Sequence, residues 1–232
     1  VHLIFVTGGT GLLGNCVVRE LVQRGIPTRV LCRAQTSQAP FAGLNVDIVE
    51  GDLESVELLS RATQGCEAVI HCAAMIHIGW SRLEESRRAN VVGTHHVLQA
   101  CRAAGSRLIY VSTVDTLPAA PDIEHPIAED AVAGIAKTRC AYVISKLEAE
   151  HHVAHAIDHE ELDAAIIHPG FMLGPYDWKP SSGRMMLEVN RAPVVAAPPG
   201  GCSLCDARDV AAAIVNAISM ATQRLKRDFV PS

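Results

Sequence analysis

Aromatic side chains are scarce in this sequence, and neither sign of charge dominates it. Phe, Trp and Tyr make up 4% of the 232 residues, and the formal net charge is -5 at pH 7. No basic run indicates a nucleic-acid partner, and no acidic tract indicates a disordered tail. Apolar residues nevertheless make up 49% of the chain, which is typical of an α/β protein whose parallel strands are buried on both faces.

Long apolar runs are missing as well. No stretch approaches the roughly 18 residues that a membrane-spanning helix needs, so we expect no membrane partner. The opening segment Val1–Val6 carries neither a charged lead nor a cleavage site, and we interpret it as a strand rather than a signal peptide. These absences favour a cytoplasmic protein.

The eight cysteines do not follow the pattern of a disulfide-stabilised or metal-binding protein. They are scattered, several within apolar runs, so we expect buried thiols in a reducing cytoplasm. Cys202 and Cys205 have the spacing of a redox or zinc pair, but no second pair accompanies them. His151, His155 and His159 recur every four residues, a spacing that can bind zinc, but we expect them on the exposed end of a helix. The sequence therefore predicts no metal.

Strand-like and helix-like segments alternate along the front half of the chain. The expected strands are Leu3–Val6, Thr28–Cys32, Val46–Glu50, Ala68–Cys72, Leu108–Ser112 and Ala164–His168. The expected helices are Gly11–Arg24, Glu54–Thr63, a long helix ending near Ala104, Cys140–His159 and Asp206–Ala221. This alternation predicts an α/β fold with a doubly wound parallel sheet and helices on both faces.

A glycine-rich turn follows the first expected strand and opens the first expected helix. Gly8, Gly11 and Gly14 would permit a tight turn, close approach of a phosphate to backbone N–H groups, and packing of the helix on the strand. The positive end of the helix dipole would then face the phosphate. We expect a dinucleotide to bind here, against Gly8, Thr10, Gly11, Leu12 and Leu13. The strand–turn–helix context makes the motif more specific than three glycines alone.

The end of the second expected strand bears on the choice of dinucleotide. NAD-selective sites usually place a carboxylate there, whereas an arginine suits the 2′-phosphate of NADP. This chain has Arg33 and no acidic residue at that point, so we favour NADP, with NAD as the alternative. Arg33 could also be an ordinary solvated side chain.

Two further loops are expected to line the cofactor crevice. Asp52, followed by Leu53, could accept a hydrogen bond from the adenine amino group, or cap the next helix, or do both. Ala73 and Ala74 are small enough for the backbone to pass close to the ribose. Both loops follow strands whose carboxyl ends face the crevice in such a sheet.

Tyr142 and Lys146 are four residues apart in an expected helix and therefore share one face. Reduction of a carbonyl needs a proton donor, and a nearby ammonium group can lower the pKa of a phenol by about 1–3 units. The pair thus predicts an acid/base device. Ser112 or Thr113, at the end of the fifth strand, is expected to donate a hydrogen bond to the substrate oxygen.

Taken together, these residues resemble the extended short-chain dehydrogenase/reductase family of the epimerase/dehydratase type. The matching segments are Thr7-Gly8-Gly9-Thr10-Gly11-Leu12-Leu13-Gly14, Gly51-Asp52-Leu53, His71-Cys72-Ala73-Ala74, Asn90-Val91-Val92-Gly93-Thr94, Tyr110-Val111-Ser112-Thr113, Tyr142-Val143-Ile144-Ser145-Lys146 and His168-Pro169-Gly170. They occur in the order and spacing of the family and cover nearly the whole chain. The resemblance implies a Rossmann-type fold.

The resemblance also implies roles for individual residues. Tyr142 would be the acid/base, and Lys146 would bind the nicotinamide ribose and tune the phenol. Thr113 is the best-aligned position for the catalytic hydroxyl of the family, which is usually Ser, so Ser112 remains a rival.

Three more residues acquire roles through the resemblance. Pro169 and Gly170 would pack on the nicotinamide, and Asn90 would support the site from the long helix. The helices near Asn90 and Tyr142 are available for a homodimer with a four-helix interface, which the family often forms.

The resemblance divides the chain at residue 170. Residues 1–170 would form the NAD(P)-binding domain, and residues 171–232 a substrate-loop region with a returning helix. Family members usually continue further, so we expect the substrate-binding part to be incomplete. We expect loops across Phe171–Gly201 and a last strand at Asp228–Val230.

Within the family, the sequence looks most like the dihydroflavonol reductase branch. We therefore expect an NADP-dependent oxidoreductase acting on a carbonyl or hydroxyl of a hydrophobic small molecule. The alternatives are a nucleotide-sugar epimerase or dehydratase with tightly bound NAD, a 3-beta-hydroxysteroid dehydrogenase-like enzyme, and a non-catalytic cofactor sensor, against which the Tyr142 and Lys146 pair argues.

The loops after the fourth and sixth strands are rich in large side chains. We expect them to form a lipophilic substrate pocket, although ordinary loop packing would also explain them. The residues concerned are Met75, His77, Trp80, Phe171, Met172, Tyr176 and Trp178. His71 ends a buried strand, and we expect a hydrogen-bonded core histidine rather than a catalyst.

Overall fold

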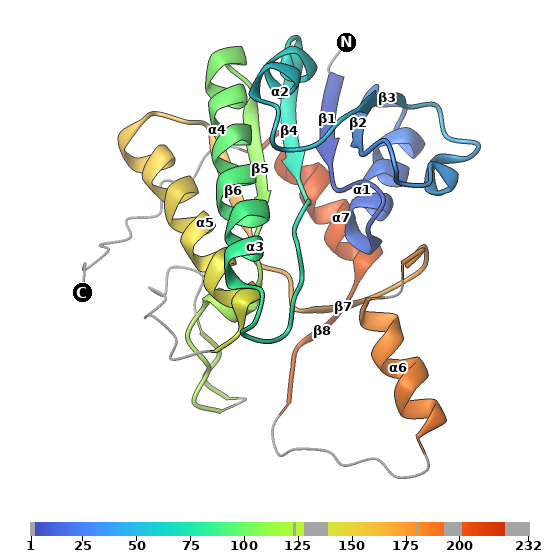
Figure 1. The fold of residues 1–232 in the computed structure, drawn as a ribbon, viewed down its shortest axis with the longest axis vertical. Helices are drawn as coiled ribbons and strands as arrows, with labels where there is room; N and C mark the ends of the chain where they lie inside the picture. Colours follow the sequence, from blue (N-terminus) through green and yellow to red (C-terminus); the bar gives the residue numbers. More distant parts are fainter. Residues whose placement is uncertain (1–2, 123, 128–138, 180, 193–200, 221–232) are drawn as a thin grey trace.

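A six-stranded, wholly parallel sheet forms the centre of the molecule (Figure 1). In this computed structural model, residues 3–122, 124–127, 139–179, 181–192 and 201–220 are described. The strands are β1 (Leu3–Thr7), β2 (Thr28–Cys32), β3 (Asp47–Glu50), β4 (Cys66–His71), β5 (Arg107–Val111) and β6 (Ala164–Ile167). Their order is β3-β2-β1-β4-β5-β6, so the winding reverses between β1 and β4. This confirms the predicted doubly wound fold, in which ligands bind at the reversal point.

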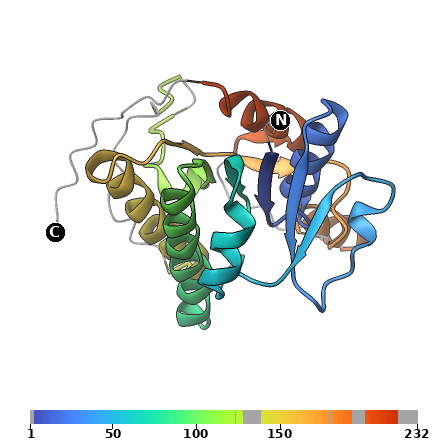
Figure 2. The same ribbon diagram turned by 90° about the horizontal axis from the view of Figure 1, so that it is seen from above.

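Helices cover both faces of the sheet (Figures 1 and 2). On one face lie α1 (Leu12–Gln23) and α7 (Ala207–Ala217), which pack against each other. On the other lie α2 (Val56–Thr63), α4 (Gly93–Ala104) and α5 (Ala141–His159). Alternate residues of a strand point to opposite faces: Ile4 and Val6 join the α1 and α7 core, whereas Phe5 joins the α2, α4 and α5 core.

The middle residues of the central strands are mostly apolar because both faces of these strands are buried. Every residue of β5 is buried, and Ala68, Val69 and Ile70 of β4 are fully inaccessible. Parallel strands sandwiched between helix layers lose the alternation of apolar and polar residues. This is why short apolar runs were sufficient to predict the strands.

The long helix before β5 is irregular. It begins as α3 (Leu83–Arg87), continues as a π-helical turn, η2 (Arg88–Val92), and ends as α4. Gly105 terminates α4 with a φ of 67°, the left-handed conformation that glycine adopts most easily. The stop at Ala104 was predicted, but the π turn was not.

The back part of the chain contains structure that the sequence did not predict. Two short strands, β7 (Phe171–Leu173) and β8 (Leu204–Asp206), pair in parallel, and α6 (Ser182–Arg191) follows β7. The expectation of loops across Phe171–Gly201 was therefore wrong. The strands have three residues each, too few for a recognisable period, and α6 has no buried residue.

Some predicted boundaries also moved. Ser112 and His168 lie one residue beyond β5 and β6 instead of inside them. The last helix begins at Ala207 because Asp206 is its N-cap and accepts a hydrogen bond from the Arg208 N–H. The strand expected at Asp228–Val230 lies outside the described residues.

Two smaller helical turns complete the fold, η1 (Ala39–Phe41) and η3 (Val114–Thr116). Figure 1 shows β7, β8 and α6 beyond the carboxyl ends of the main-sheet strands, at the edge where α5 begins. Within the described ranges, no helix has the length and apolar character required to cross a membrane.

Candidate active site

The glycine turn between β1 and α1 folds back closely on itself. Gly8 has a φ of 75°, and a Cβ atom there would lie 2.5 Å from the backbone N of Ala73. A Cβ atom at Gly14 would lie 2.2 Å from the carbonyl oxygen of Gly8. The Gly11 N–H donates to that same oxygen at 3.0 Å. Side chains at these positions would fill the turn. Because glycines stand there instead, the α1 N-terminus is open to an anion, which fits a dinucleotide pyrophosphate.

The residues around the turn differ in exposure. Thr10 is half-buried, whereas Leu12 and Leu13 are buried in the core beneath the turn. Ala73 lies against Gly8, and Ala74 is exposed beside it. Of the predicted set, Leu12 and Leu13 therefore offer a ligand only their backbone.

The other two predicted cofactor loops are exposed. Arg33 follows β2, its side chain lies in solvent, and its carbonyl accepts a hydrogen bond from Thr36 N–H at 2.8 Å. Asp52 is also exposed, and its Oδ1 accepts from Glu54 N–H at 2.9 Å. It stabilises the turn ahead of α2, whose N-cap is Ser55. Neither the Arg33 nor the Asp52 side chain packs in the hydrophobic core.

Leu53 lies on the opposite side of that loop from solvent. A Cβ atom added to Gly93 would come within 3.0 Å of the Leu53 side chain. The Leu53 carbonyl also lies 2.7 Å from Nδ1 of His96 on α4. Leu53 therefore fixes the loop against α4.

A chain of buried hydrogen bonds connects the glycine turn with the long helix. His71 Nδ1 lies 2.6 Å from Thr7 Oγ1, and His71 Nε2 lies 3.1 Å from Thr94 Oγ1. Thr94 donates to the Asn90 carbonyl at 2.5 Å, and Thr7 accepts from the Ala73 N–H at 3.4 Å. These contacts fit a neutral imidazole that donates from Nε2 to Thr94, and burial lowers the pKa of His71 to about 3. His71 is thus a satisfied core histidine, as predicted.

Asn90 occupies the π turn and is buried. Its Oδ1 accepts from the Met75 N–H at 2.7 Å, and its Nδ2 donates to the Met75 carbonyl at 3.0 Å and to Ser145 Oγ at 2.9 Å. Ser145 in turn donates to the Tyr142 carbonyl at 3.0 Å. One amide therefore joins the loop after β4 to the helix that carries Tyr142.

Tyr142 lies beside the end of β5. Its phenol lies near Thr113, whose hydroxyl acts to lower the pKa of Tyr142 and whose Oγ1 lies 3.2 Å from Asp115 Oδ2. Burial and then the negative charge of Asp115 raise the pKa of Tyr142 to about 12, against the opposing effect of the Thr113 hydroxyl. Lys146 is not among the groups that shift this pKa here.

Lys146 points elsewhere. Its side chain is 2% exposed, its Nζ donates to the Val111 carbonyl at 2.6 Å, and it lies 4.1 Å from the centre of the Tyr110 ring. Burial lowers the pKa of Lys146 to about 7, although the charge of Glu150 opposes this shift. The ammonium is therefore stabilised by a carbonyl and a π face, not by the Tyr142 phenol.

The structure separates the two candidate hydroxyls. Thr113 lies near Tyr142, whereas Ser112 donates to Glu150 Oε2 at 2.5 Å. Glu150 was not among the predicted residues. Its place four residues after Lys146, on the same helix face, was the available signal. Asp115 was also missed, because a carboxylate in the loop after a strand usually caps a turn.

Pro169 and Gly170 lie between β6 and β7. The Pro169 carbonyl accepts from the Val114 N–H at 3.1 Å. A Cβ atom at Gly170 would lie 2.6 Å from the Ser203 carbonyl oxygen. The segment is thus held between η3 and β8, at the same sheet edge as Thr113.

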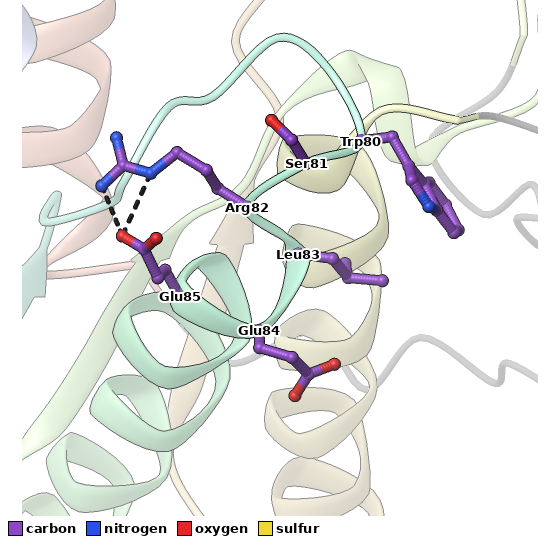
Figure 3. A pocket seen from close by; sticks show the side chains of 6 residues that line it. All are labelled: Trp80, Ser81, Arg82, Leu83, Glu84 and Glu85. Atoms are coloured by element: carbon purple, nitrogen blue, oxygen red, sulfur yellow. Dashed lines mark hydrogen bonds and ion pairs between the residues drawn. The ribbon is translucent and has the colours of Figure 1, made fainter.

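One surface hollow in the described part of the chain includes a residue of the predicted lipophilic set. This hollow of about 370 Å³ contains Trp80 alone from that set (Figure 3). Its lining consists of Trp80, Ser81, Arg82, Leu83, Glu84 and Glu85. Arg82 reaches Glu85 on the side away from Trp80 (Figure 3). Tyr176 instead lies under the Arg19 guanidinium, 3.9 Å from ring centre to cation.

The segment before this hollow is extended and presents apolar side chains outward. Ile76, Ile78 and Trp80 are 61%, 78% and 57% exposed, whereas the intervening residues are half-buried. The Gly79 carbonyl accepts from the Ala141 N–H at 2.7 Å, one residue before Tyr142. The apolar row is therefore attached directly to the start of α5.

The residues considered for metal binding have other contacts. The rings of His155 and His159 are 4.7 Å apart, and Cys205 Sγ lies 3.8 Å from the Phe171 carbonyl. Among the residues with described positions, no three His, Cys, Asp or Glu side chains are grouped to hold a metal ion. All eight cysteines are free thiols.

Comparison with known proteins gives matches along almost the whole chain. The model of the NAD dependent epimerase/dehydratase family matches residues 4–230. A Synechocystis protein named as a candidate dihydroflavonol 4-reductase is 34% identical over 210 residues, covering 90% of this chain and 60% of its own. Sterol demethylase protein B of Methylococcus capsulatus is 33% identical over 213 residues, covering 89% and 63%.

The fold also matches a solved structure. The Thermus thermophilus UDP-glucose 4-epimerase in complex with NAD superposes with a TM-score of 0.79 at 24% identity, over 95% of this chain and 75% of that one. This similarity concerns the fold. The chain spans less than two thirds of the length of the two relatives named above.

Proposed function

The chain belongs to the NAD dependent epimerase/dehydratase family, and we propose that it is an NADP-dependent oxidoreductase acting on a carbonyl or hydroxyl of a hydrophobic small molecule. The observation that carries the proposal is the placement of Tyr142 near the Thr113 hydroxyl, on the helix that also buries Lys146. A phenol and a hydroxyl lie at the sheet edge that holds the glycine cradle, and the buried Lys146 ammonium lies one helical turn beyond the phenol on α5, against the end of β5. This set suits proton transfer at a substrate oxygen.

In the reductive direction, Tyr142 is the proton donor. When bound, the nicotinamide supplies or accepts the hydride. Because the pKa of Tyr142 is raised to about 12, its Oη holds a proton at neutral pH and can release it to an oxygen that gains negative charge. Thr113 orients that oxygen through a hydrogen bond. The reverse oxidation would need the phenolate, which burial and Asp115 disfavour, so we propose that reduction is the working direction.

The cofactor would lie across the reversal point of the sheet. Gly8, Thr10, Gly11 and the N–H groups at Leu12 and Leu13 would hold the pyrophosphate. The remaining contacts would come from residues of the neighbouring strand ends and loops, namely Asp52, Leu53, Ala73, Ala74, Asn90, Lys146, Pro169 and Gly170.

The exposed Arg33 supports NADP over NAD. It stands at the end of β2, where its exposed guanidinium makes no ion pair with a described residue and can make a two-pronged contact with a 2′-phosphate. In that position NAD sites usually present a carboxylate, and this chain has none.

A lipophilic substrate is supported by the apolar row Ile76, Ile78 and Trp80 beside the start of α5. Two relatives carry names that refer to sterols, and a third is named 2-alkyl-3-oxoalkanoate reductase. We further propose a cytoplasmic location, consistent with the free thiols, and a homodimer that pairs α4 and α5 of two subunits.

The test is a turnover screen of the purified chain with ketones, aldehydes and alcohols of graded hydrophobicity, using NADPH and NADH. Tyr142→Phe should lower kcat by at least about a hundredfold, the usual contribution of a positioned acid. Tyr176→Phe, half-exposed against Arg19, is the matched control and should keep its activity. Full activity in Tyr142→Phe would contradict the mechanism, and retained NAD without net turnover would indicate an epimerase.

A further inference from the structure

A buried carboxylate joins four segments of the site. Glu150 on α5 is 1% exposed, yet three side chains reach it. Ser112 donates to Oε2 at 2.5 Å, Thr116 lies 2.8 Å from the same oxygen, and His168 Nε2 lies 3.0 Å from Oε1. These partners come from the end of β5, from η3 and from the end of β6. A carboxylate with this many donors is held in one geometry.

Each of these segments carries a residue that the proposed reaction uses. Ser112 precedes Thr113, and Thr116 Oγ1 also donates to the Thr113 carbonyl at 2.8 Å. His168 directly precedes Pro169 and Gly170. Displacing the Glu150 carboxylate would therefore release, relative to α5, both the hydroxyl that lies near Tyr142 and the segment expected to face the nicotinamide.

Glu150 also stands one helical turn beyond Lys146, on the same face of α5. The titratable groups that influence Lys146 are Glu150 from α5, His71 and Cys72 from the end of β4, and, by ring contact, Tyr110 from β5. Burial holds His71 neutral, raises the pKa of the Cys72 thiol to about 12 and raises the pKa of Tyr110 further still. At neutral pH, Glu150 is thus the negative charge in this set.

Glu150 is ionised at neutral pH because its hydrogen-bond partners lower its pKa. Burial alone raises the pKa of Glu150, but hydrogen bonding and the charge of His168, with the hydrogen bonds from Ser112 and Thr116, lower it to about 2. A buried ammonium without a compensating charge would lose its proton.

We propose that Glu150 is a positioning residue of this site: its buried carboxylate locks α5 to the ends of β5 and β6 and, from one turn along the same helix face, is the counter-charge that favours the protonated form of Lys146. The role of Lys146 in turnover rests on the proposed function. The anchoring of α5 (the lock) and the electrostatic effect on Lys146 (the counter-charge) can be tested by different substitutions.

The chain offers a direct measurement of the counter-charge. It contains four lysines, Lys137, Lys146, Lys179 and Lys226, so protein labelled with ¹³C at lysine Cε gives few signals. Lys146→Met identifies the signal of Lys146. Its titration is then followed by NMR in the parent and in Glu150→Gln, which keeps the size of the side chain and removes the charge. We expect the titration midpoint of Lys146 to fall by about 1–3 units.

Glu148→Gln is the matched control. Glu148 lies on the same helix and pairs with Arg87 at the partly exposed surface, so its removal should leave the Lys146 titration unchanged. Glu150→Asp keeps the charge but shortens the reach to Ser112 and His168. It should retain most of the Lys146 titration and still lower kcat more than it raises KM, because the lock is loosened.

An unchanged Lys146 midpoint in folded Glu150→Gln would overturn the counter-charge. Parental kcat in Glu150→Asp and Glu150→Gln would overturn the lock. If Glu150→Gln fails to fold, Glu150→Asp is compared with Glu148→Gln. Equal kcat and equal KM in those two variants would contradict the proposal. A shifted Lys146 titration without turnover of any carbonyl, in the parent included, would instead refute the proposed function and leave the counter-charge standing.

Discussion

Replacement of Gly8 by alanine tests the glycine cradle most directly, because a matched position exists at the other end of the same helix. Gly8 and Gly25 have nearly equal φ angles, 75° and 69°. An L-residue in this left-handed region costs about 1–2 kcal/mol. The surroundings differ: a Cβ at Gly8 would lie 2.5 Å from Ala73 N, whereas a Cβ at Gly25 has nothing within 4 Å.

The difference in unfolding free energy between the two variants therefore measures the steric clash of the Gly8→Ala side chain with the backbone. Overpacking of this kind costs about 1–3 kcal/mol. We expect Gly25→Ala to lose about 1–2 kcal/mol of unfolding free energy, and Gly8→Ala to lose about 2–5 kcal/mol. Relief of the clash must move Ala73 or the turn itself, so NADPH affinity should fall at least about tenfold in Gly8→Ala, roughly 1.4 kcal/mol, and stay constant in Gly25→Ala.

Two measurements check this pair. Urea denaturation followed by circular dichroism gives the unfolding free energies, and fluorescence titration gives the Kd for NADPH at a concentration of urea where both variants are folded. Equal destabilisation of the two variants would refute the steric argument. A folded Gly8→Ala with the parental Kd would refute the assignment of the pyrophosphate to this turn.

Two further substitutions test the cofactor choice and the proton donor. Arg33→Gln removes the exposed guanidinium and should raise the KM for NADPH at least about tenfold while leaving that for NADH unchanged; steady-state kinetics with both cofactors would show equal changes if Arg33 is only a surface residue. Asp115→Asn removes a charge that raises the pKa of Tyr142. That pKa should fall from about 12, and the alkaline decline of reductive kcat/KM, where the phenol loses its proton, should begin at lower pH; a superimposable pH profile would show that Asp115 does not act on Tyr142.

The fold could be predicted from the sequence because its signals are local. The runs around Ile4 and Ile109 are apolar because both faces of the sheet are covered, and a strand between two helix layers needs little else. The glycine at 14 is dictated by a contact within a single turn, whereas the close approach at Gly8 is made by Ala73 after β4. Where the signal was weak, as in α6 with no buried residue, the prediction failed.

The site could be predicted only in part, because its electrostatics depend on contacts between distant segments. The spacing of Tyr142 and Lys146 indicated a pair, and the two do share one helix. The direction of the Lys146 side chain is set by the Val111 carbonyl, 35 residues away in sequence. The raised pKa of Tyr142 depends on Asp115, which reaches the site through the turn after β5. Neither contact can be inferred from the regular spacing of residues in a helix or a strand.

The residues that anchor α5 are different from the residue that we propose as the proton donor. Asn90 anchors α5 through Ser145 at 2.9 Å, and Glu150, further along the same helix, anchors it through buried contacts with the strand ends. Tyr142 lies at the beginning of this twice-anchored helix, beside the exposed Asp115. A proton donor fixed by its scaffold can then meet substrate and solvent on one side without losing its geometry. Substitutions at the two anchors should therefore change kcat before they change substrate affinity.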